Sequence, residues 1–573
     1  MATDSAALTA SVHKRPTIVL EKEEYDLIVV GAGPVGMMIA NLVGPSGLRV
    51  LILEQLPSLI DYPRGVGMDD ECLRVFQSAG LVEKAIPFTF PNQWLDFRTA
   101  RGRTFAMVKP KGEAFGFPKR NAFIQPLIDR VLLEGLVRYK NVEMRLGYEM
   151  TGLSDNGRAV HVTARAIDGE ERRFTTSYLV GCDGGRSLTR KLVGIPFEGQ
   201  TESTRWLVID IKNDPIGVPS AILVCDPSRP YVTIALPHGI RRLEFMVKPN
   251  ETEEELCSTE GLKRILSIAM PDPASARIIR SRVYTHHARL AKAFRAGRVL
   301  LAGDAAHLMP VWQGQGYNSG IRDANNLSWK LISVLRDGCD PTLLDTYETE
   351  RREHARAMIS LSTLVGRIFS PTSWLLASFR DVVFGILNRI PPVRDYVVQM
   401  RFKPMPKYTE GVVVGGVSSG RTRNAVGRLF VQPRVALRNG SVVRLDDAIG
   451  YRFAIVAWAA DPCIYMNGEA RRVWSRLNGT TVVVRSQTEL MSDTNDVDPE
   501  TVLVGDVSGG LKEWFATEDT SVAILRPDRF VAAVCRPQEI SRAINALGRA
   551  MRMQSEKGVP YCTNADNNCA NVG

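Results

Sequence analysis

Of all features of the sequence, a glycine-rich turn near the N-terminus most strongly limits which folds this chain can adopt. Gly31, Gly33 and Gly36 form GxGxxG directly after the apolar strand predicted at Asp26–Val30 and before the apolar, helix-like segment MMIANLV. Glu54 ends the next predicted strand, VLILE, 18 residues after Gly36. In such a unit the glycines let the backbone approach a pyrophosphate, and the acid accepts hydrogen bonds from an adenosine ribose. The segment therefore predicts dinucleotide binding rather than a purely structural turn.

A second segment decides between a nicotinamide and a flavin dinucleotide, since either fits the first unit. Gly303 lies 267 residues after Gly36 and, with Asp304, ends the predicted strand RVLLA, whereas Gly314 and Gly316 precede a predicted helix. A carboxylate at a strand end can bind the hydroxyls of a ribityl chain. Backbone N–H groups at a helix start carry a partial positive charge that suits the anion of reduced flavin. This segment favours FAD over a surface Gly-Asp turn.

A third signal, weaker by itself, is Asp183 with Gly184 in YLVGCDGGRS. An Asp-Gly pair alone is usually a plain turn. It acquires functional meaning only beside the two other motifs.

Composition excludes several other classes of protein. The 573 residues suffice for two or three domains. The net charge of +10 comes from scattered Lys and Arg, which favours anionic ligands over nucleic acid, and the nine cysteines show no CxxC pair or zinc spacing, so no metal is expected. No run of about 18 apolar residues and no signal sequence occur, which predicts a cytoplasmic protein without a membrane partner.

The predicted fold class is α/β, in three parts. A discontinuous Rossmann-like FAD-binding domain (residues 25–200 and 286–400) contains the three motifs, and alternating strands such as Tyr231–Pro237 and Leu243–Val247 predict an antiparallel β-sheet substrate domain over residues 201–285. Strands near FAIVAW, TTVVV and SVAIL predict a third α/β domain over residues 412–552. The polar segments 1–24 and 553–573 are expected to be disordered tails.

The three motifs together carry a family resemblance. With GAGPVG, CDGGRS and GDAAHLMP, the chain resembles the class A flavoprotein aromatic hydroxylases, which include p-hydroxybenzoate hydroxylase and phenol hydroxylase. Stretches such as LIDYPRGVGMDDE, PKRNAFIQP, RPYVTIALPH and FKPMP extend the match from about residue 25 to about residue 535. The resemblance implies a p-hydroxybenzoate hydroxylase-like FAD-binding domain and a thioredoxin-like C-terminal domain. Because Cys463 lacks a CxxC partner, a packing or dimer role is expected for that domain.

The resemblance also assigns roles to single residues. Arg64 in the YPRG turn and Gln125 in FIQP correspond to FAD contacts, Asp183 to a position linked with FAD and pyridine nucleotide, and Asp304 to the ribityl contact. Without the family, a surface ion pair for Arg64 and a turn-capping role for Gln125 are the better interpretations.

The chemistry that the resemblance implies needs NADH, FAD and O2. NADH reduces FAD, O2 adds to the reduced flavin as a hydroperoxide, and the distal oxygen attacks the ring carbon ortho to a phenol. The segments around the motifs imply a small phenolic acid as substrate, namely 3-(3-hydroxyphenyl)propionate or 3-hydroxycinnamate, which is converted to the 2,3-dihydroxy product in aromatic catabolism.

Deprotonation of the phenol needs help from the protein. Forming phenolate at pH 7 spans about three pKa units, or roughly 4 kcal/mol, so a base or hydrogen-bond relay is expected. The candidates, each of which also fits a packed or capping residue, are His307, Tyr231, His238 and Tyr317. A substrate carboxylate needs a cation or a donor, for which the candidates are Arg241, Arg242, His286 and His287.

Two alternatives remain open at this stage. One is a related hydroxylase acting on another phenol, such as resorcinol or a polyketide. The other is a flavin-binding redox sensor or assembly partner without turnover. A homodimer is a further expectation.

Overall fold

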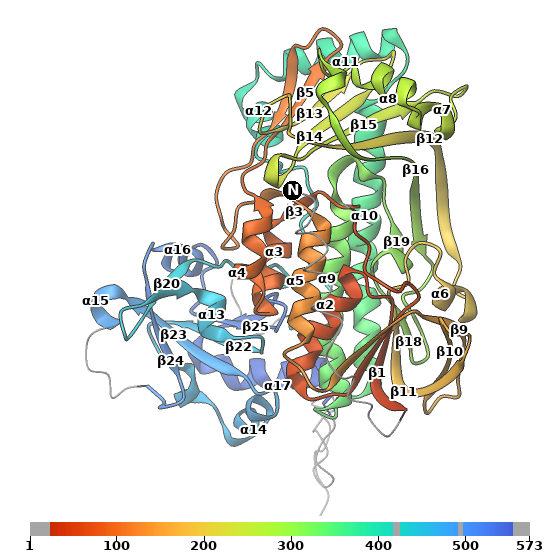
Figure 1. Ribbon diagram of the computed structural model, residues 1–573. Coiled ribbons are helices and arrows are strands. Elements are labelled where there is room, and N and C mark those ends of the chain that lie inside the picture. The colour runs from red at the N-terminus through yellow and green to blue at the C-terminus, as the bar shows by residue number, and fades with distance from the viewer. Residues whose placement is uncertain (1–22, 63, 416–424, 491–496, 554–573) are drawn as a thin grey trace, which may run out of the picture.

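Two large sheets and a separate C-terminal unit make up the protein. The computed structural model describes residues 23–62, 64–415, 425–490 and 497–553, and the predicted tails lie almost wholly outside these ranges. Figure 1 shows the first sheet beside a bundle of central helices, the second sheet above them, and the C-terminal unit to one side. None of the helices in the described ranges is long and apolar enough to span a membrane.

The first sheet is the expected Rossmann-like one. Its path runs in the order β17 (Arg295–Ala296), β18 (Val299–Leu301), β11 (Glu171–Gly181), β1 (Glu24–Val30), β2 (Val50–Glu54) and β8 (Val142–Leu146). The pairs from β18 to β8 are all parallel, so the carboxyl ends of these strands share one edge. A hairpin, β9 (Tyr148–Asp155) and β10 (Val160–Ala166), continues from β11.

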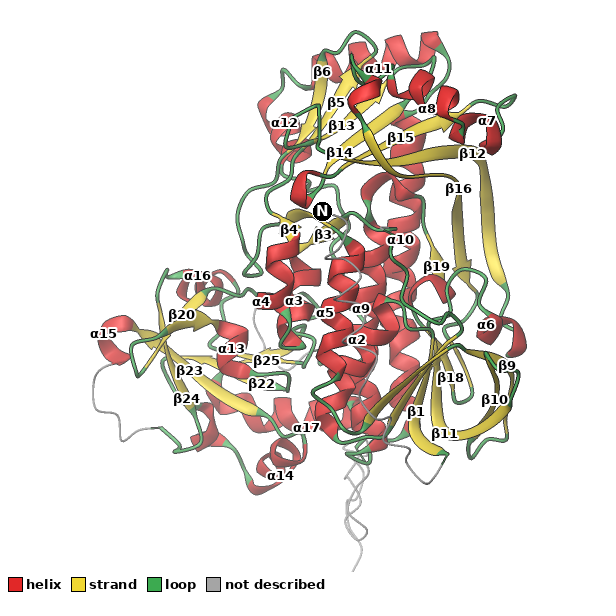
Figure 2. Cartoon of the chain, viewed as in Figure 1, coloured by secondary structure: helices red, strands yellow, loops and turns green. Residues whose placement is uncertain are grey.

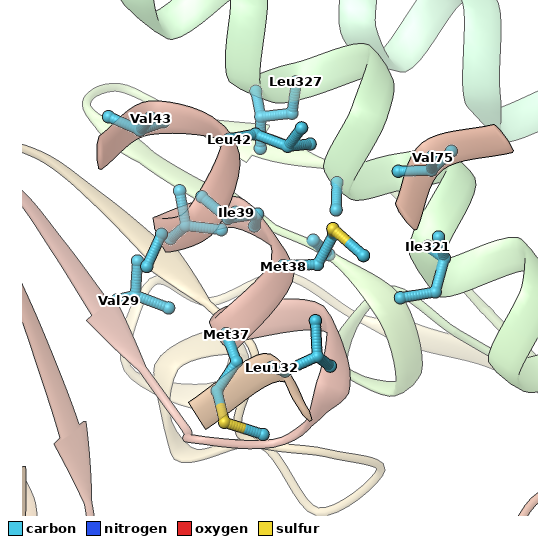
Figure 3. Close-up of a cluster of buried hydrophobic side chains, with 14 of the residues drawn as sticks. Val29, Met37, Met38, Ile39, Leu42, Val43, Val75, Leu132, Ile321 and Leu327 are labelled. Carbon is cyan, nitrogen blue, oxygen red and sulfur yellow. The ribbon is translucent and has the colours of Figure 1, made fainter. Parts of the chain in front are cut away.

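Helices cover one face of this sheet and bury its apolar side chains. They are α2 (Pro34–Val43), α3 (Asp70–Ser78), α5 (Gln125–Leu136), α9 (Gln315–Leu335) and α10 (Asp345–Phe369). In Figure 3, Met38 of α2 lies among side chains from α3, α5 and α9, including Val75, Leu132 and Ile321. The helix predicted after Gly314 and Gly316 is confirmed by α9.

The second sheet is antiparallel in all but one of its pairs. Its order is β19 (His307–Leu308), β16 (Arg277–Ala291), β12 (Phe197–Lys212), β15 (Arg241–Val247), β14 (Tyr231–Ala235), β13 (Ala221–Cys225), β5 (Leu95–Thr99) and β6 (Thr104–Val108). Only β5 and β13 pair in parallel. The predicted domain limits at residues 200/201 and 285/286 fall inside β12 and β16, and β5 and β6 join this sheet although they precede it by about 90 residues.

Each face of the second sheet has its own helices. Helices α7 (Glu253–Cys257) and α8 (Thr259–Leu266) pack on the face that includes Leu243 and Phe245. On the other face, α10 and α11 (Trp374–Leu387) bring Phe369 and Phe384 onto Phe105, with α12 (Pro391–Val398) beside them. In Figure 2 the long strands β12 and β16 connect this sheet with the region of β19 and α6 (Leu188–Leu192).

The C-terminal unit contains the third large sheet. Its order is β21 (Val442–Arg444), β20 (Arg434–Leu437), β24 (Val502–Asp506), β23 (Thr480–Ser486), β22 (Ala454–Trp458), β25 (Val522–Leu525) and β26 (Val531–Cys535). The strands β22, β23 and β24 are parallel, and β25 and β26 are antiparallel. Its helices are α13 (Leu445–Ile449), α14 (Gly468–Arg476), α15 (Gln487–Leu490), α16 (Gly510–Thr517) and α17 (Ile540–Ala550). The thioredoxin-like assignment stays a prediction.

Buried ion pairs join the C-terminal unit to the rest of the chain. Arg74 of α3 forms a bidentate pair with Asp446 of α13, at 2.7 and 2.9 Å. Arg526 contacts Glu350 of α10 at 2.7 and 2.8 Å, and neither side chain is exposed. Because a buried charge is costly without its partner, these pairs make the relative position of the parts specific.

Candidate active site

The turn between β1 and α2 has the geometry of a phosphate-binding loop. Gly31 has φ +108°, and a Cβ there would lie 2.5 Å from the carbonyl oxygen of Cys182. A Cβ on Gly36 would lie 2.1 Å from the carbonyl oxygen of Gly31, so this residue permits close packing of helix and strand. A Cβ on Gly33 would meet no atom within 4 Å. The second glycine therefore faces open space, where a pyrophosphate can approach the N-terminus of α2.

Glu54 stands directly beside this turn, at the end of β2. Its Oε2 accepts a hydrogen bond of 2.8 Å from the N–H of Ala32, and its Oε1 accepts one of 2.9 Å from the N–H of Leu56. The carboxylate is thus fixed at the edge where the turn between β1 and α2 begins, and its contact with a ribose stays a prediction.

The other two motifs come to the same edge of the sheet. Asp183 follows β11, and Gly303 follows β18, so both lie at carboxyl ends of strands that neighbour β1. Asp183 accepts hydrogen bonds from Ser187 Oγ (2.5 Å) and the Thr189 N–H (2.9 Å), which cap α6. Gly303 has φ +61°, and a Cβ on it would press on Val35 at 2.8 Å. Motifs separated by more than 250 residues thus form one site at the end of a parallel sheet.

Asp304 faces the YPRG turn across this site. Its Oδ2 lies 3.5 Å from Nη2 of Arg64, and both side chains are partly exposed. Gln125, at the start of α5, is buried and stabilises this turn. Its Oε1 accepts hydrogen bonds from the N–H groups of Arg64 (3.1 Å) and Gly65 (2.7 Å). Its Nε2 donates to Asp129 at 3.2 Å, and burial raises the pKa of Asp129 to about 7.

The N-terminus of α9 completes the site. Gly314 is its N-cap with φ +64°, and Gly316 lies in its first turn. Asn318 fixes this end of the helix by donating to the carbonyl oxygens of Gly314 (2.9 Å) and Gly67 (3.0 Å). The free N–H groups of the first turn give this end a positive potential.

Two of the four candidate bases follow the Gly303–Asp304 motif in the chain, His307 in β19 at the edge of the second sheet and Tyr317 in α9. His307 is buried, and its Nε2 lies 2.7 Å from Asp323. Burial alone would raise the pKa of Asp323, but attraction to His307 and Arg351 lowers it to about 2. Tyr317 is partly buried and packs against Gly65; burial of its hydroxyl raises the pKa of that group, which finds no partner among the described residues.

The other two candidate bases lie in β14 and in the turn that follows it. Tyr231 stacks on Phe245, 5.3 Å between ring centroids, on the face covered by α7 and α8. His238 is exposed in a turn with φ +57°. Within the described residues, no hydrogen bond or ring contact joins any two of the four candidates, so the structure does not assemble them into one relay.

The residues expected to bind a substrate carboxylate are mostly engaged elsewhere. Arg241 pairs with Asp214 at 2.5 and 2.7 Å, and Arg242 pairs with Asp210 at 2.8 and 3.0 Å. His287 contacts Thr201 Oγ1 at 3.1 Å. His286 is buried, and burial lowers its pKa to about 4, so its ring is neutral near pH 7.

Sequence reasoning missed two features of the sheet face that bears Arg242. Arg280 lies over the ring of Tyr62, 3.6 Å from its centroid, and donates to Tyr284 at 2.8 Å. Trp206 stacks on His286 and meets the edge of Trp312, which comes from the loop before α9. The alternation of β16 could have placed Arg280 on this face, but the contact with Trp312 depends on tertiary packing.

The described turn and helix ends fit FAD. The open approach at Gly33 has room for a pyrophosphate, the carboxylates of Glu54 and Asp304 could accept hydrogen bonds from sugar hydroxyls, and the start of α9 has the potential that suits a reduced flavin ring. No cluster of metal-binding side chains occurs in the part of the chain that the structure describes.

Comparison with known proteins agrees with this geometry. Residues 24–362 match the model of the FAD binding domain family, and residues 427–550 match the HcaD C-terminal domain. The chain is 47% identical to the 3-(3-hydroxy-phenyl)propionate/3-hydroxycinnamic acid hydroxylase of Paraburkholderia xenovorans, over 93% of this chain and 92% of that protein. It is 48% identical to the hydroxylase of the same name from Mycobacterium avium, over 94% of each.

Solved structures show the same fold at lower identity. The flavin-dependent monooxygenase PieE, in complex with FAD and substrate, matches with a TM-score of 0.78 at 18% identity, over 93% of this chain and 99% of that one. Aklavinone-11 hydroxylase with FAD and aklavinone matches with a TM-score of 0.72 at 20% identity, over 93% and 100%. The p-hydroxybenzoate hydroxylase-like fold is thereby confirmed, and the chain belongs to the family of FAD-dependent aromatic hydroxylases.

Proposed function

We propose that this monooxygenase uses NADH and O2 to hydroxylate 3-(3-hydroxyphenyl)propionate and 3-hydroxycinnamate at the position ortho to the phenol. The names of the relatives supply the substrate class. One structural observation carries the proposal: the YPRG turn of the flavin site touches the second sheet directly. Arg242 donates to the carbonyl oxygen of Arg64 at 3.4 Å, and Arg280 lies on Tyr62. A substrate held on this sheet therefore lies next to the flavin.

The chain's own residues bind and orient the cofactor. Gly31, Gly33 and Gly36 admit the pyrophosphate, Glu54 binds the adenosine ribose, and Asp304 binds the ribityl chain. Arg64, Gln125 and Asp183 line the FAD-binding site. The first turn of α9 would stabilise the reduced flavin ring, and this turn is surrounded by Gly303, Gly314 and Gly316. Bound FAD supplies electron transfer from NADH and the activation of O2.

The phenol is activated by the chain, and His307, Tyr231, His238 and Tyr317 remain the proposed groups. Of these we favour Tyr317, because it is partly buried against Gly65 with its hydroxyl unpartnered among the described residues. His307 acts through Asp323 on the backbone of Gly303, whose N–H donates to Asp323 at 3.0 Å, and this is a positioning role. The rings of Trp206 and Trp312 exclude water from the reacting centre.

The carboxylate of the substrate is proposed to pair with Arg280. A neutral His286 supplies no positive charge, and Arg241 and Arg242 are already neutralised by aspartates. No carboxylate pairs with Arg280 among the described residues, and its guanidinium faces the flavin turn through Tyr62. Arg280 therefore has a charge that no carboxylate neutralises among the described residues, and it lies next to the flavin turn.

Replacing Arg280 tests this pairing. Arg280→Met is expected to raise KM for 3-(3-hydroxyphenyl)propionate on the order of tenfold or more, because a charge-assisted hydrogen bond is lost. The KM for 3-propylphenol, which has no carboxylate, should stay unchanged. Arg264→Met, on the exposed helix α8, is the control. An equal rise of KM for both phenols would contradict the pairing.

The overall activity is tested with a panel of phenols. NADH oxidation should be stimulated by 3-(3-hydroxyphenyl)propionate, with the 2,3-dihydroxy product formed, and NADPH should be the poorer reductant. Stimulation by resorcinol or a polyketide alone would favour the related hydroxylase, and bound FAD without oxygen transfer to any phenol would favour the sensor. A cytoplasmic location and a homodimer complete the proposal.

A further inference from the structure

One carboxylate on the second sheet is buried without a hydrogen-bond donor. Glu244 belongs to β15 and is 9% exposed. Nη1 of Arg242 lies 4.0 Å from its Oε1, beyond hydrogen-bonding distance, and the Nε and Nη2 atoms of Arg242 donate to Asp210 instead. Among the described residues no group donates a hydrogen bond to the Glu244 carboxylate. Because a buried acceptor without a donor is costly, this carboxylate indicates a donor that comes from outside the chain.

Glu244 faces the flavin side of the second sheet. Its neighbours in the strand, Leu243 and Phe245, pack under α7 and α8, and side chains alternate between the two faces of a strand. Nη1 of Arg242, which lies near the Glu244 carboxylate, also donates to the carbonyl oxygen of Arg64 at 3.4 Å. One guanidinium nitrogen therefore connects Glu244 with the YPRG turn, so the carboxylate lies beside the proposed flavin site.

Arg280, the proposed partner of the substrate carboxylate, lies on the same face as Glu244. Arg280 pairs across the sheet with Asp210, and Asp210 pairs with Arg242, so the three side chains share one face. Glu244 follows Arg242 on this face, two residues along β15, and β15 is two strands from β16, on the order of 10 Å. This separation suits a ligand whose carboxylate meets Arg280 and whose phenol group, at the other end of a ring and a three-carbon chain, reaches Glu244.

The four candidate bases named above are poorly suited to keep the proton of a phenol. Burial raises the pKa of Tyr231 and of Tyr317, so both hydroxyls are neutral near pH 7 and act as donors. His307 is engaged with Asp323 at 2.7 Å, and His238 is exposed in its turn. A hydroxyl such as that of Tyr317 stabilises a phenolate by donating to it, but the proton removed from the phenol still needs a base.

Glu244 has the charge and the surroundings of such a base. Burial raises the pKa of its carboxyl group, attraction to Arg242 lowers it, and repulsion from Asp210 raises it, with a net upward shift. A carboxylate with a raised pKa holds a proton more strongly than an ordinary glutamate does. The difference between its pKa and that of the phenol is therefore smaller, which favours proton transfer.

We propose that Glu244 is a catalytic residue that accepts the proton of the substrate's phenol group. The O–H bond of the phenol breaks, its electron pair stays on the oxygen as a phenolate, and the proton moves to the carboxylate, which becomes neutral. When the oxygenated ring regains its aromaticity, Glu244 returns this proton to the ring oxygen, and the hydrogen released from the ring carbon leaves with the water that the reaction forms. This role rests on the proposed function, which supplies the phenol, NADH and O2.

Glu244→Gln tests this role, because it keeps the size of the side chain and removes the base. When the reduced, FAD-loaded enzyme is mixed with O2 and 3-(3-hydroxyphenyl)propionate, the rate at which the 2,3-dihydroxy product forms should fall on the order of 100-fold or more. The FAD content and the melting temperature should be no lower than those of the wild type. Glu198→Gln, at an exposed position of β12, is the matched control and should keep the full rate.

Phenols of different acidity separate proton transfer from a structural role. Fluorine on the ring of the substrate makes its phenol more acidic, so less help from a base is needed. The ratio of the wild-type rate to the Glu244→Gln rate should therefore shrink as the pKa of the phenol falls below the pH of the assay. Glu244→Asp, which retains a carboxylate, should be faster than Glu244→Gln with the unsubstituted phenol.

Two results would overturn the role of Glu244 and leave the proposed function intact. One is a Glu244→Gln variant that hydroxylates at the wild-type rate, and the other is a loss of rate that is equal for every phenol, whatever its pKa. A wild type that hydroxylates no phenol at all would contradict the proposed function itself, and the role of Glu244 with it.

Discussion

At the scale of single residues, the three glycines of the first motif have different tasks. Gly31 and Gly36 are required by the protein itself, because a Cβ on either would collide with backbone atoms. Gly33 has ordinary dihedral angles, φ −71° and ψ 174°, and open space around it. Its lack of a side chain therefore serves the ligand and not the fold.

Gly33→Ala should separate cofactor binding from folding. The apoprotein is expected to melt as the wild type does, whereas the dissociation constant for FAD should rise roughly tenfold, ~1.4 kcal/mol, as the methyl group holds the pyrophosphate away. Flavin fluorescence titration and calorimetry measure the two quantities. Gly385→Ala, also free of neighbours within 4 Å, should alter neither flavin affinity nor activity. Unchanged FAD affinity in Gly33→Ala would refute the assigned role.

Asp129 makes stability depend on pH. Burial raises its folded pKa from 3.8 to about 7, so the folded state binds more protons than the unfolded state between these values. Stability therefore falls as pH rises from about 4 to about 7, and the full penalty, roughly 4 kcal/mol, is present above pH 7. Asp129→Asn keeps an acceptor for Gln125 and removes this penalty.

The expected result is a higher melting temperature for Asp129→Asn than for the wild type at pH 8, with the difference shrinking toward pH 4. Thermal unfolding of the apoprotein across this pH range measures it. Asp168→Asn, in an exposed turn, is the control and should show no such trend. A constant difference at all pH values would mean that Asp129 does not titrate in this range.

At the scale of elements, α3 shows how a helix of the flavin-binding part docks the C-terminal unit. Arg74 contacts Asp446 through two hydrogen bonds, and its Nη1 also donates to the carbonyl oxygen of Phe430 at 2.5 Å. Both charged side chains are about 4% exposed. Asp446 also pairs with Arg529 at 3.0 Å, so the buried carboxylate keeps one cationic partner when Arg74 is removed.

Arg74→Met is accordingly expected to lower the free energy of unfolding by about 2 kcal/mol, because Arg529 still balances the buried carboxylate of Asp446. Arg74→Met/Asp446→Leu should lower it further, because the buried guanidinium of Arg529 then loses its carboxylate partner. Urea unfolding followed by tryptophan fluorescence measures both. Arg165→Met, which breaks the exposed pair with Glu149, should cost less than about 1 kcal/mol.

Local elements could be predicted from the sequence because local patterns determine them. The strand before Gly31, the strand ending at Glu54, the strands β14 and β15 and the long helix α9 were all expected, and the periodicity of two or 3.6 residues explains each. The pairing of β5 with β13 was not, since a parallel pair between segments about 125 residues apart leaves no local trace.

Some residues of the candidate site could be predicted from the sequence and others could not. Its glycines and acids lie at the ends of predicted strands, so their spacing along the sequence is enough to identify them. The buried support beneath Arg64, from Gln125 to Asp129, and the contact of Arg280 with Tyr62 depend on which segments meet in space. The pattern of residues in one segment indicates its own secondary structure, but it seldom indicates which distant segments that structure will contact.

At the scale of the whole molecule, the flavin edge lies where three sets of contacts meet. The first sheet supplies the cofactor loops, the second sheet closes over them through Arg242 and Arg280, and Glu350 of α10 ties the C-terminal unit to the helices behind the site. Glu350 also accepts a hydrogen bond of 2.8 Å from Lys330 of α9, the helix whose N-terminus lies at the proposed flavin site.

The composition of the second sheet restricts how new substrate preferences can arise. The chain enters the second sheet through β12 and leaves it through β16, and these two long strands pair with each other. Residues 201–285 therefore resemble a segment that recombination could exchange between related proteins. This segment is incomplete, however, because β13 pairs with Leu95–Thr99, which is encoded far upstream. A segment transferred from a relative would have to pair with the β5 strand of the recipient protein, or β5 would have to be transferred with it. Substrate range in such enzymes should therefore change more readily by point substitution than by exchange of whole segments.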